Sequence, residues 1–436
     1  MGKAGTVVIL AAGAGTRFLS SRPKVCQSLC GRPLIGWVLE QALALEPERI
    51  VLVVGHGADE VKAAVAAEGR SKDWIERVHF VLQAQRKGTG HAVLQALPEL
   101  GSGDPVLVLY GDMPLLRPET LGELCAARSR ARAAILSAVV AKPRGFGRIL
   151  RERERFTGVV EDKDATREQR LIREVNVGVY AFARADLERF LPRLTDRNSQ
   201  GEFYLTDLPA LLLGEGGTVE VVTLEDERDA IGINTIEHLS EARAELQRRI
   251  LAEHMAAGVY IEDPATTFID HGVEIGAGAR ILPCCVIRAG VKIGRDCEVG
   301  PFTHLRAGTV LEPGAEVGNF TEAKNAQIGE HTKAKHLSYL GDVTIGRDAN
   351  IGAGTIVANY DGKKKHRTVI GDRAFVGSGS VLIAPCQVGE GALTGGGAVV
   401  TRNSSVPPGA AWVGVPARPL KPKEARPPRP AREDEP

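Results

Sequence analysis

Residues 269–300 read IDHGVEIGAGARILPCCVIRAGVKIGRDCEVG, and this stretch decides the fold of the second half of the chain. An aliphatic residue occupies every sixth position, and several are followed by glycine. A period of six matches neither an α-helix nor an alternating strand, but it is the repeat of a parallel β-helix. We expect each of these side chains to point inward and to stack on its equivalent in the next coil. The unbroken series comprises Ile269, Ile275, Ile281, Ile287, Ile293, Val299, Leu305, Leu311 and Val317.

The same frame returns later in the chain, after two interruptions. It is found again at Ile345, Ile351, Val357, Ile370, Val376, Leu382 and Val388. The aliphatic pattern is missing at 318–344 and at 358–369, and both segments are rich in polar residues. We therefore expect loops to leave the solenoid in both places.

The first half of the chain alternates apolar strands with helical patterns. Residues 6–10, 50–54 and 106–109 are continuous aliphatic runs, which suit strands buried on both faces of a parallel sheet. Helical periodicity covers 34–45 and 58–67. This alternation predicts a doubly wound, Rossmann-like α/β domain with a mostly parallel sheet. Ligands of such domains lie beyond the carboxyl ends of the strands.

The changes of period divide the chain into four segments. We expect an α/β domain at 1–232, a linker helix at 233–257 and the β-helix at 258–417. The tail at 418–436 is rich in proline, arginine and glutamate, and we expect it to be disordered.

The composition favours a soluble enzyme of the cytoplasm. The formal net charge is +1, so there is no basic excess of the kind that nucleic-acid binding requires. No apolar run approaches the roughly 20 residues that cross a bilayer, and no signal peptide precedes the first strand. The 7 cysteines are scattered and form neither a disulfide framework nor a zinc motif. We therefore expect reduced thiols, and neither nucleic acid nor a membrane as a partner.

A glycine-rich loop, LAAGAGTR at 10–17, follows the first strand. Such a loop lets backbone N–H groups approach phosphate oxygens, and Arg17 and Lys24 would add charge for a triphosphate. Asp112 follows another buried strand, where a carboxylate is a suitable magnesium ligand. Plainer explanations stay open at this point. The loop could be an ordinary β-turn-α connection with solvated basic residues, and Asp112 could cap a helix or form a turn.

A second set of polar residues suits acyl transfer from a thioester to a sugar amine. His336 can take the proton of the attacking amine near neutral pH, and Glu322 is a candidate to orient it. Arg306, Lys324 and Lys365 can bind a sugar phosphate. Each residue alone also has a structural explanation, because histidines are often structural and lysine runs are often solvated.

Together these motifs closely resemble the bifunctional N-acetylglucosamine-1-phosphate uridylyltransferase/glucosamine-1-phosphate acetyltransferases (GlmU family). The resemblance covers roughly residues 5–415 and implies that the β-helix is left-handed. In the first half it is carried by residues 10–17 with Pro23 and Lys24, 83–91 (QAQRKGTGH), 110–115 (YGDMPL), 145–149 (GFGRI), 160–165 (VEDKDA), 176–180 (NVGVY) and 232–235 (GINT). In the second half it is carried by 317–324 (VGNFTEAK), 335–342 (KHLSYLGD) and 359–365 (NYDGKKK).

The resemblance implies a role for each matching residue. Catalytic roles would fall to Lys24, Arg17 and His336, with Glu322 orienting His336. Asp112 and Asn234 would hold Mg²⁺, and Gln83 would contact uracil. The nucleotide and sugar contacts would be Leu10, Ala11, Gly13, Lys24, Gln83, Gly88, Thr89, Gly147, Glu161, Asn176 and Asn234. The sugar phosphate of the acetyltransferase site would meet Arg306, Lys324, Tyr339, Asn350 and Lys365, and acetyl-CoA would meet Asn359, Tyr360, Ser378 and Gly396.

The implied activity is a two-step synthesis of UDP-N-acetylglucosamine for peptidoglycan, lipopolysaccharide or other cell-envelope amino sugars. Acetyl-CoA would acetylate glucosamine-1-phosphate, and UTP would then uridylylate N-acetylglucosamine-1-phosphate with release of pyrophosphate. Two alternatives stay open: a related enzyme for another nucleotide, such as thymidylate, or another amino sugar, and a non-catalytic pyrophosphorylase-like subunit. The presence of Lys24, Asp112, Asn234 and His336 argues against the second alternative.

Hexapeptide solenoids usually form trimers, because the flat faces of a prism pack around a threefold axis. We therefore expect a homotrimer in which different chains contribute residues to one acetyltransferase site. The chain departs from the family at the coenzyme-binding end. Relatives commonly place an arginine near the segment corresponding to 412–416, whereas here the nearest basic residues are Arg418 and Lys421.

Overall fold

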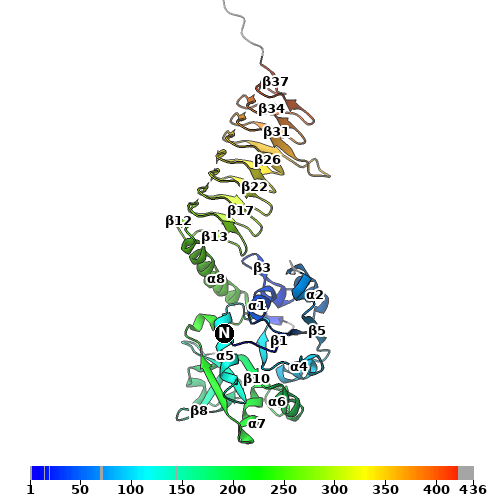
Figure 1. Ribbon diagram of the computed structural model, residues 1–436, viewed down its shortest axis with the longest axis vertical. Helices are drawn as coiled ribbons and strands as arrows, with labels where there is room; N and C mark the ends of the chain where they lie inside the picture. The colour runs from blue at the N-terminus through cyan, green and yellow to red at the C-terminus, as the bar shows by residue number, and fades with distance from the viewer. Residues whose placement is uncertain (1, 14, 19, 69–71, 144, 421–436) are drawn as a thin grey trace, which may run out of the picture. The chain divides into compact units, whose positions relative to one another are not determined.

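The computed structural model describes residues 2–13, 15–18, 20–68, 72–143 and 145–420. It divides into two compact units, Met1–Leu246 and Gln247–Pro436, each of which is drawn in Figure 1. Of the tail expected at 418–436, residues 421–436 lie outside the described residues, and so does Lys421. None of the described helices is long and apolar enough to cross a membrane.

The first unit contains a sheet with the strand order β11-β7-β10-β6-β1-β4-β5. All pairs along this order are parallel except those of β10, which runs antiparallel to both neighbours. A hairpin of β8 and β9 extends β10, and β2 pairs with β3. The strands are β1 (Thr6–Ala11), β2 (Ser28–Leu29), β3 (Arg32–Pro33), β4 (Arg49–Val54), β5 (Val78–Leu82), β6 (Val106–Tyr110), β7 (Ala133–Val139), β8 (Gly147–Glu152), β9 (Arg155–Val160), β10 (Glu174–Phe182) and β11 (Val219–Thr223).

Helices cover both faces of this sheet. Successive residues of β1 enter different cores: Val7 and Ile9 lie in one, and Val8 and Leu10 lie in the other. The first core includes residues of α1 (Leu34–Leu43), α2 (Ala58–Glu68) and α5 (Pro118–Arg128), with α3 (Lys72–Ile75) at its margin. The second includes residues of α4 (Thr89–Ala96), α6 (Arg184–Phe190) and α7 (Leu208–Gly214). The predicted Rossmann-like α/β fold is confirmed, and polar chemistry is left to the loops at the strand ends.

The segment expected to be a linker helix forms α8 (Ile236–Ala256), and the boundary between the two units falls within it. In the second unit, the buried Gln247 side chain is paired with the backbone of Ile269. Its Nε2 donates to the Ile269 carbonyl over 2.8 Å, and its Oε1 accepts from the Ile269 N–H over 2.9 Å. This reciprocal pair satisfies backbone groups on the edge strand of the first coil.

The second unit winds through three parallel sheets in turn, because each short strand pairs with the third strand after it. The β12 sheet holds β12 (Tyr260–Ile261), β15 (Arg280–Ile281), β18 (Glu298–Val299), β21 (Glu316–Asn319), β24 (Lys333–His336), β27 (Asn350–Ile351), β30 (Phe375–Val376), β33 (Leu393–Thr394), β36 (Ala411–Val413) and the antiparallel β37 (Arg418–Pro419). The β13 sheet holds β13 (Phe268–Ile269), β16 (Val286–Ile287), β19 (His304–Leu305), β22 (Glu322–Lys324), β25 (Tyr339–Gly341), β28 (Ile356–Ala358), β31 (Val381–Ile383) and β34 (Val399–Val400). The β14 sheet holds β14 (Glu274–Ile275), β17 (Lys292–Ile293), β20 (Val310–Leu311), β23 (Gln327–Ile328), β26 (Val343–Ile345), β29 (Thr368–Ile370), β32 (Gln387–Val388) and β35 (Ser405–Val406). The unit is the expected left-handed parallel β-helix.

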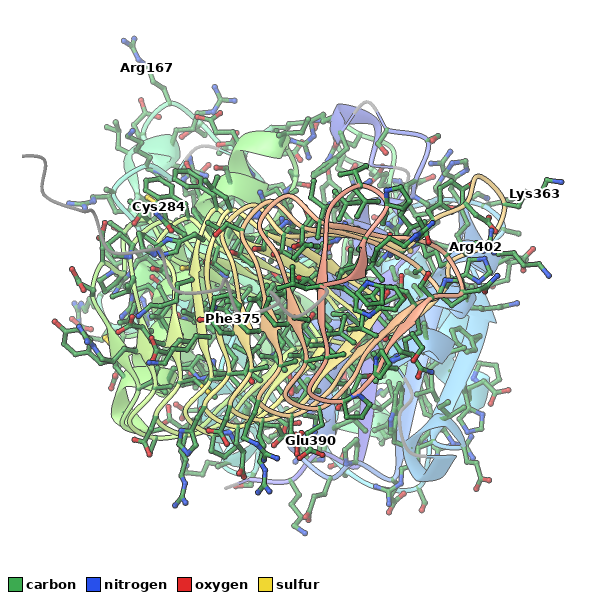
Figure 2. All side chains as sticks on the ribbon, turned by 90° about the horizontal axis from the view of Figure 1, so that it is seen from above. Arg167, Cys284, Lys363, Phe375, Glu390 and Arg402 are labelled. Atoms are coloured by element: carbon green, nitrogen blue, oxygen red, sulfur yellow. The ribbon has the colours of Figure 1, made fainter. Side chains whose placement is uncertain are left out.

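Three corners connect the sheets. The first corner leads from the β12 sheet to the β13 sheet and carries Cys284, and the second leads to the β14 sheet and carries Lys363 and Arg402. The third corner, which carries Glu390, leads back to the β12 sheet. In Figure 2 the labels of Cys284, Arg402 and Glu390 lie at three separate corners of the coil.

The aliphatic residues of the six-residue series line the interior of these coils. Eight members of the unbroken series are buried, and Ile275 is partly buried. All seven members of the second series are buried as well. The predicted inward stack is therefore confirmed.

The expectation of a loop at 318–344 is wrong, because this segment stays in the coil as β21 to β26. Its inward positions are Ala323, Ile328, Ala334 and Leu340, all fully buried. The register pairs Leu305 with Ala323 but Leu311 with Ile328, so the coil loses one residue between these positions. Two alanines and two five-residue steps, from Ala323 to Ile328 and from Leu340 to Ile345, hid the repeat from a search for large aliphatic residues every six positions.

The second interruption, at 358–369, does leave the coil. The register jumps from Val343 to Thr368, and the intervening excursion is closed by an isolated bridge between Tyr360 and Lys365. Figure 2 shows Lys363 on a loop that projects from the coil, on the same side as Arg402. The loop predicted here is confirmed.

We predict that Leu340→Ala lowers the free energy of unfolding of the β-helix by about 2–5 kcal/mol, because it opens a cavity in a packed stack. Hydrogen exchange of peptides that span 334–358 measures the change. The matched control is Leu337→Ala, since Leu337 is 60% exposed and the change should cost less than about 0.5 kcal/mol. Equal effects of the two substitutions would contradict the assignment of Leu340 to the interior.

Candidate active sites

The side chains of Lys24, Asp112 and Asn234 converge on one point of the first unit. Lys24 begins the short 3₁₀ helix Lys24–Cys26, Asp112 follows β6, and Asn234 precedes α8. The Lys24 Nζ donates to Asp112 Oδ2 and, over 3.0 Å, to Asn234 Oδ1. The side chains of Lys24 and Asp112 are only 11% and 18% exposed, which makes this ion pair stronger than one on the surface.

A cavity of about 580 Å³ opens on one side of this point, at the carboxyl ends of β1, β5 and β6. It is lined by most of the residues expected to contact the nucleotide: Leu10, Ala11, Gly13, Lys24, Gln83, Gly88 and Thr89. Arg86, Tyr110 and Glu202 also line it, although the sequence analysis assigned them no role. Ala14, which lies in the same loop, is outside the described residues.

A second cavity of about 320 Å³ lies on the other side. Its lining includes the residues expected to contact the sugar, Gly147, Glu161 and Asn176, together with Asn234 and Arg17. Tyr110 and Asp112 line both cavities, so the two spaces meet beside the Lys24–Asp112 pair. The exposed Arg17 lines the second cavity and is not part of the lining of the first.

Neighbouring side chains hold Glu161 and Asn176 in place. Burial raises the pKa of Glu161, while a hydrogen bond that the Thr206 hydroxyl donates to Oε1 over 3.0 Å opposes this shift. Asn176 donates from Nδ2 to the hydroxyl of the buried Tyr180 over 2.7 Å. Both side chains are thus fixed before a ligand arrives.

The donors around Lys24 fit a magnesium ion. Asp112 Oδ2 and Asn234 Oδ1 both face the Lys24 ammonium, so two oxygens already converge on one positive charge. Mg²⁺ prefers oxygen ligands and usually takes only one or two from the protein, with water and phosphate oxygens completing its shell.

In the second unit, three cations meet at the second corner. Arg306 and Lys324 are neighbours in successive coils, because Leu305 pairs with Ala323. The close approach of the Lys365 ammonium lowers the pKa of Lys324, and the charge of Arg306 lowers it further. Cations that crowd together in this way make a binding site for an anion such as a phosphate.

Tyr339 and Asn359 lie beside this cation cluster. A Cβ atom on Gly341 would come within 2.7 Å of both the Tyr339 hydroxyl and Asn359 Nδ2, so glycine leaves the room that they occupy. Asp342 accepts hydrogen bonds from Asn359 and Asn325. The two expected ligand contacts, Tyr339 and Asn359, are therefore adjacent and supported from behind.

His336 is exposed at the end of β24, where the chain enters the first corner. Its Nδ1 lies 3.1 Å from Asn319 Oδ1, and the two residues are register partners in successive coils. A carbonyl oxygen can only accept, so Nδ1 is the donor in this contact, and in the neutral ring the free lone pair lies on Nε2.

The expected contact between Glu322 and His336 is not formed within the described chain. Glu322 instead accepts from Arg306 Nη1 over 2.7 Å in the cation cluster. The two residues lie in different sheets: His336 shares the β12 sheet with Asn319, whereas Glu322 lies in the β13 sheet.

Of the four residues expected to contact acetyl-CoA, Ser378 and Gly396 share a column with His336, whereas Asn359 and Tyr360 lie at the second corner. The register pairs Lys333 with Asn350, Asn350 with Phe375 and Phe375 with Leu393. His336, Ser378 and Gly396 each come three residues after one of the paired positions Lys333, Phe375 and Leu393. They therefore lie one above another at the first corner. One edge of the β13 sheet thus bears the column of His336, Ser378 and Gly396 (the His336 column), and the opposite edge bears the cation cluster.

The projecting loop is fastened by Asp361. Its Oδ1 accepts from the backbone N–H groups of Lys363 and Lys364, and its Oδ2 lies 2.7 Å from His366 Nε2 and 3.1 Å from Arg402 Nη2. These contacts, the backbone N–H of Lys364 first, hold the pKa of Asp361 well below its usual range. Asp361 therefore fixes the loop that presents Asn359, Tyr360 and Lys365.

The sequence carries a signal for three residues of these sites to which the motifs gave no role: Asn319, Asp361 and Tyr110. Asn319 precedes His336 by the length of one shortened coil, Asp361 lies in the projecting loop, and Tyr110 belongs to the same motif as Asp112. Glu202 had no such signal, because it is far in sequence from the loop that it faces.

Comparisons with known proteins agree with this two-site organisation. Residues 7–203 match the MobA-like NTP transferase domain, and residues 367–402 match the bacterial transferase hexapeptide family with its six repeats. Three curated relatives carry the name bifunctional protein GlmU. The one from Desulfitobacterium hafniense (strain DSM 10664 / DCB-2) is 40% identical, covering 91% of this chain and 93% of its own. That from Alkalilimnicola ehrlichii is 44% identical, with 93% of each chain covered, and that from Kineococcus radiotolerans is 42% identical, covering 94% and 89%. Identity of this extent along almost the whole length establishes that the chain belongs to the GlmU family.

Proposed function

We propose that the chain synthesises UDP-N-acetylglucosamine in two steps at two separate sites. The β-helix acetylates glucosamine-1-phosphate with acetyl-CoA, and the α/β domain uridylylates the product with UTP. The observation that carries the proposal is the junction of two cavities at Lys24 and Asp112. A nucleotide on one side and a sugar phosphate on the other would meet there.

Uridylyl transfer requires an oxygen of the sugar phosphate to attack the α-phosphorus of UTP. The new O–P bond forms as the bond to the β-phosphate breaks, and pyrophosphate leaves. Lys24 would stabilise the charge that develops on the phosphorus centre, and Arg17, which lines the second cavity, would meet the incoming phosphate. Preorganised cations at this position stabilise the transition state without reorganisation.

The nucleotidyltransferase activity of the family depends on a divalent metal, and we propose Mg²⁺ held by Asp112 and Asn234. When bound, the ion would neutralise phosphate charge. The Lys24 ammonium lies between the Asp112 and Asn234 oxygens. If Mg²⁺ bound these two oxygens, the ammonium would be free to turn from Asp112 towards the phosphates. The ion pair with Asp112 then serves to keep Lys24 in reach of the reacting phosphate.

Acetyl transfer requires a base for the amine of glucosamine-1-phosphate. His336 Nε2 takes the amine proton as the nitrogen attacks the thioester carbonyl, and the coenzyme thiol leaves. The hydrogen bond between Nδ1 and Asn319 keeps the base in the correct tautomer and stabilises its cation. The cation cluster of Arg306, Lys324 and Lys365 would hold the sugar phosphate.

The hexapeptide repeats indicate that the chain forms oligomers, and we propose a homotrimer. The His336 column and the cation cluster lie on opposite edges of the β13 sheet, so a complete acetyltransferase site would combine the first corner of one chain with the second corner of another. Each chain would then contribute to two sites.

Two substitutions separate the activities. Lys24→Ala should lower UTP-dependent pyrophosphate release by about 10²–10³-fold and leave acetyl transfer intact, because it removes charge stabilisation from one site only. His336→Ala should lower acetyl transfer by about 10²–10⁴-fold and leave pyrophosphate release intact. Matched assays of both reactions on both variants test this, and loss of both activities in either variant would contradict two independent sites.

Removal of the metal should affect one reaction only. A chelator should abolish pyrophosphate release while acetyl transfer continues, and added Mg²⁺ should restore it. Asp112→Asn should raise the Mg²⁺ concentration for half-maximal rate by about tenfold or more, since loss of even an outer partner of a metal costs about 10–100-fold. An unchanged magnesium requirement in Asp112→Asn would remove Asp112 from the proposed metal site.

Mixed oligomers test the shared site. His336→Ala and Lys365→Ala should each abolish acetyl transfer alone, whereas oligomers that contain both variants should recover part of it. Recovery is expected because some sites would pair an intact His336 with an intact Lys365 from the other chain. No recovery, or a light-scattering mass near that of one 46.5 kDa chain, would overturn the shared trimeric site.

A further inference from the structure

The Gln83 amide in the nucleotide cavity is held in one orientation. Gln83 follows β5 and is 5% exposed, and its backbone N–H donates to the Val54 carbonyl over 2.8 Å. Its Nε2 lies 3.1 Å from the Gly88 carbonyl oxygen and 3.1 Å from His91 Nδ1. Both N–H groups of the amide are therefore engaged. No hydrogen bond reaches Oε1 from the part of the chain that the structure describes, and this atom is left for the cavity.

The Gly88 carbonyl shows which amide atom is the nitrogen. This oxygen also accepts from the Ala92 N–H over 3.2 Å in the first turn of α4, so the helix fixes its position. A carbonyl oxygen accepts only, and the amide atom next to it must be Nε2 rather than Oε1. The same Nε2 then faces His91, whose Nδ1 must accept and cannot carry a proton.

The surroundings of His91 keep its ring neutral. Burial, followed by the charge of Lys87, lowers the pKa of His91 below its ordinary value. The ring lies in the first turn of α4, where a positive charge is also disfavoured by the helix dipole. Its Nε2 lies 3.4 Å from the Gln95 amide, which can turn its oxygen to accept from this nitrogen.

We propose that His91 is a positioning residue for nucleobase selection: its Nδ1 holds the Gln83 amide so that Oε1 faces the base. The inference rests on the proposed function, in which Gln83 reads the base. A base that presents an N–H group, as uracil does at N3, can donate to Oε1. Cytosine presents a lone pair at N3, and two acceptors would then face each other with neither satisfied.

Protonation of His91 would weaken this selection. A proton on Nδ1 would turn it into a donor facing the donors of Nε2, while the Gly88 carbonyl would still hold Nε2, so the amide would be pushed out of its position. Oε1 would then align less well with the N–H group of the base, which weakens the binding of uracil. Because the pKa of His91 is lowered, the neutral ring and the preference for uracil are present at pH 7, and the preference is lost as the pH falls through this lowered pKa.

Other charged groups surround α4 without touching the amide. Arg86 and Glu202 line the same cavity as Gln83. The elements that pack against α4 include β4, β5 and three 3₁₀ helices, Leu97–Glu99, Leu191–Arg193 and Leu205–Asp207. Their charged or titratable residues are Arg49, His79, Glu99, Arg193 and Asp207.

The test replaces His91 by phenylalanine in the full chain and compares UTP with CTP. Phenylalanine keeps a ring beside Phe203, whose centroid lies 6.4 Å from that of His91, but it has no acceptor. We expect kcat/KM for UTP to fall, kcat/KM for CTP to rise, and their ratio to drop about tenfold. A merely structural role would lower both values together and leave the ratio unchanged, which would overturn the proposal.

Two further variants complete the design. His91→Asn offers Oδ1 as an acceptor that does not titrate, so it should restore the UTP:CTP ratio and make it less dependent on pH than in the wild type. The wild-type ratio should fall as the pH falls through the lowered pKa of His91. Because the triphosphates and cytosine N3 titrate alike with both proteins, the difference between the wild type and His91→Asn isolates the contribution of His91. His79→Phe is the matched control: His79 lies on β5 outside the cavity lining, and its ratio should equal that of the wild type.

The outcomes separate the two proposals. If the wild type releases no pyrophosphate from UTP, the proposed function fails. If the wild type is active but His91→Phe keeps the wild-type ratio while acetyl transfer is normal, only the role of His91 fails. A ratio that changes with pH as steeply in His91→Asn as in the wild type would likewise overturn it.

Discussion

In-register pairing of the backbone between successive coils is the constraint on which the second unit depends. Each strand is only two to four residues long, so it is stable only because it lies between the equivalent strands of its neighbours. Because of this pairing, residues that are one coil apart in the sequence lie next to each other on the same face. The pairing places Asn319 beneath His336 and Arg306 beside Lys324 without any loop being required to bring them together. The same pairing keeps Glu322 on a different sheet from His336.

The first unit reaches a similar end by a different route. Its strands are buried on both faces, so polar groups can gather only where parallel strands end together. Gln83 and Asp112 follow β5 and β6, and Lys24 comes from the connection after β1. A partly buried charge at such an edge loses hydration, and an ion pair or hydrogen bond must offset this loss. The Lys24 ammonium accordingly has two partners, Asp112 and Asn234.

The sequence predicted both folds and most of the residues that line the candidate sites, but it failed where the pattern depended on small residues. Ala323 and Ala334 occupy inward positions as surely as isoleucine does, yet alanine carries no periodic signal of its own. The one-residue shortening before Ile328 also shifted the frame, so the segment resembled a loop. The partner of His336 was missed for the same reason, because its identification requires the length of the shortened coil rather than the average one.

A solenoid repeats its geometry, whereas a catalytic site needs different groups at neighbouring points. The chain resolves this conflict by departing from the repeat where the chemistry lies. The inward position next to Lys324 is the small residue Ala323 instead of a large aliphatic one. The coil is one residue shorter directly after Lys324, between Ala323 and Ile328. The excursion after β28 then adds Lys365, which no regular corner could bring to Lys324, and Asp361 fixes that excursion to the coil through Arg402. Irregularity in this solenoid is therefore a positional requirement of the site, and the regular coils on either side supply the rigidity that holds it.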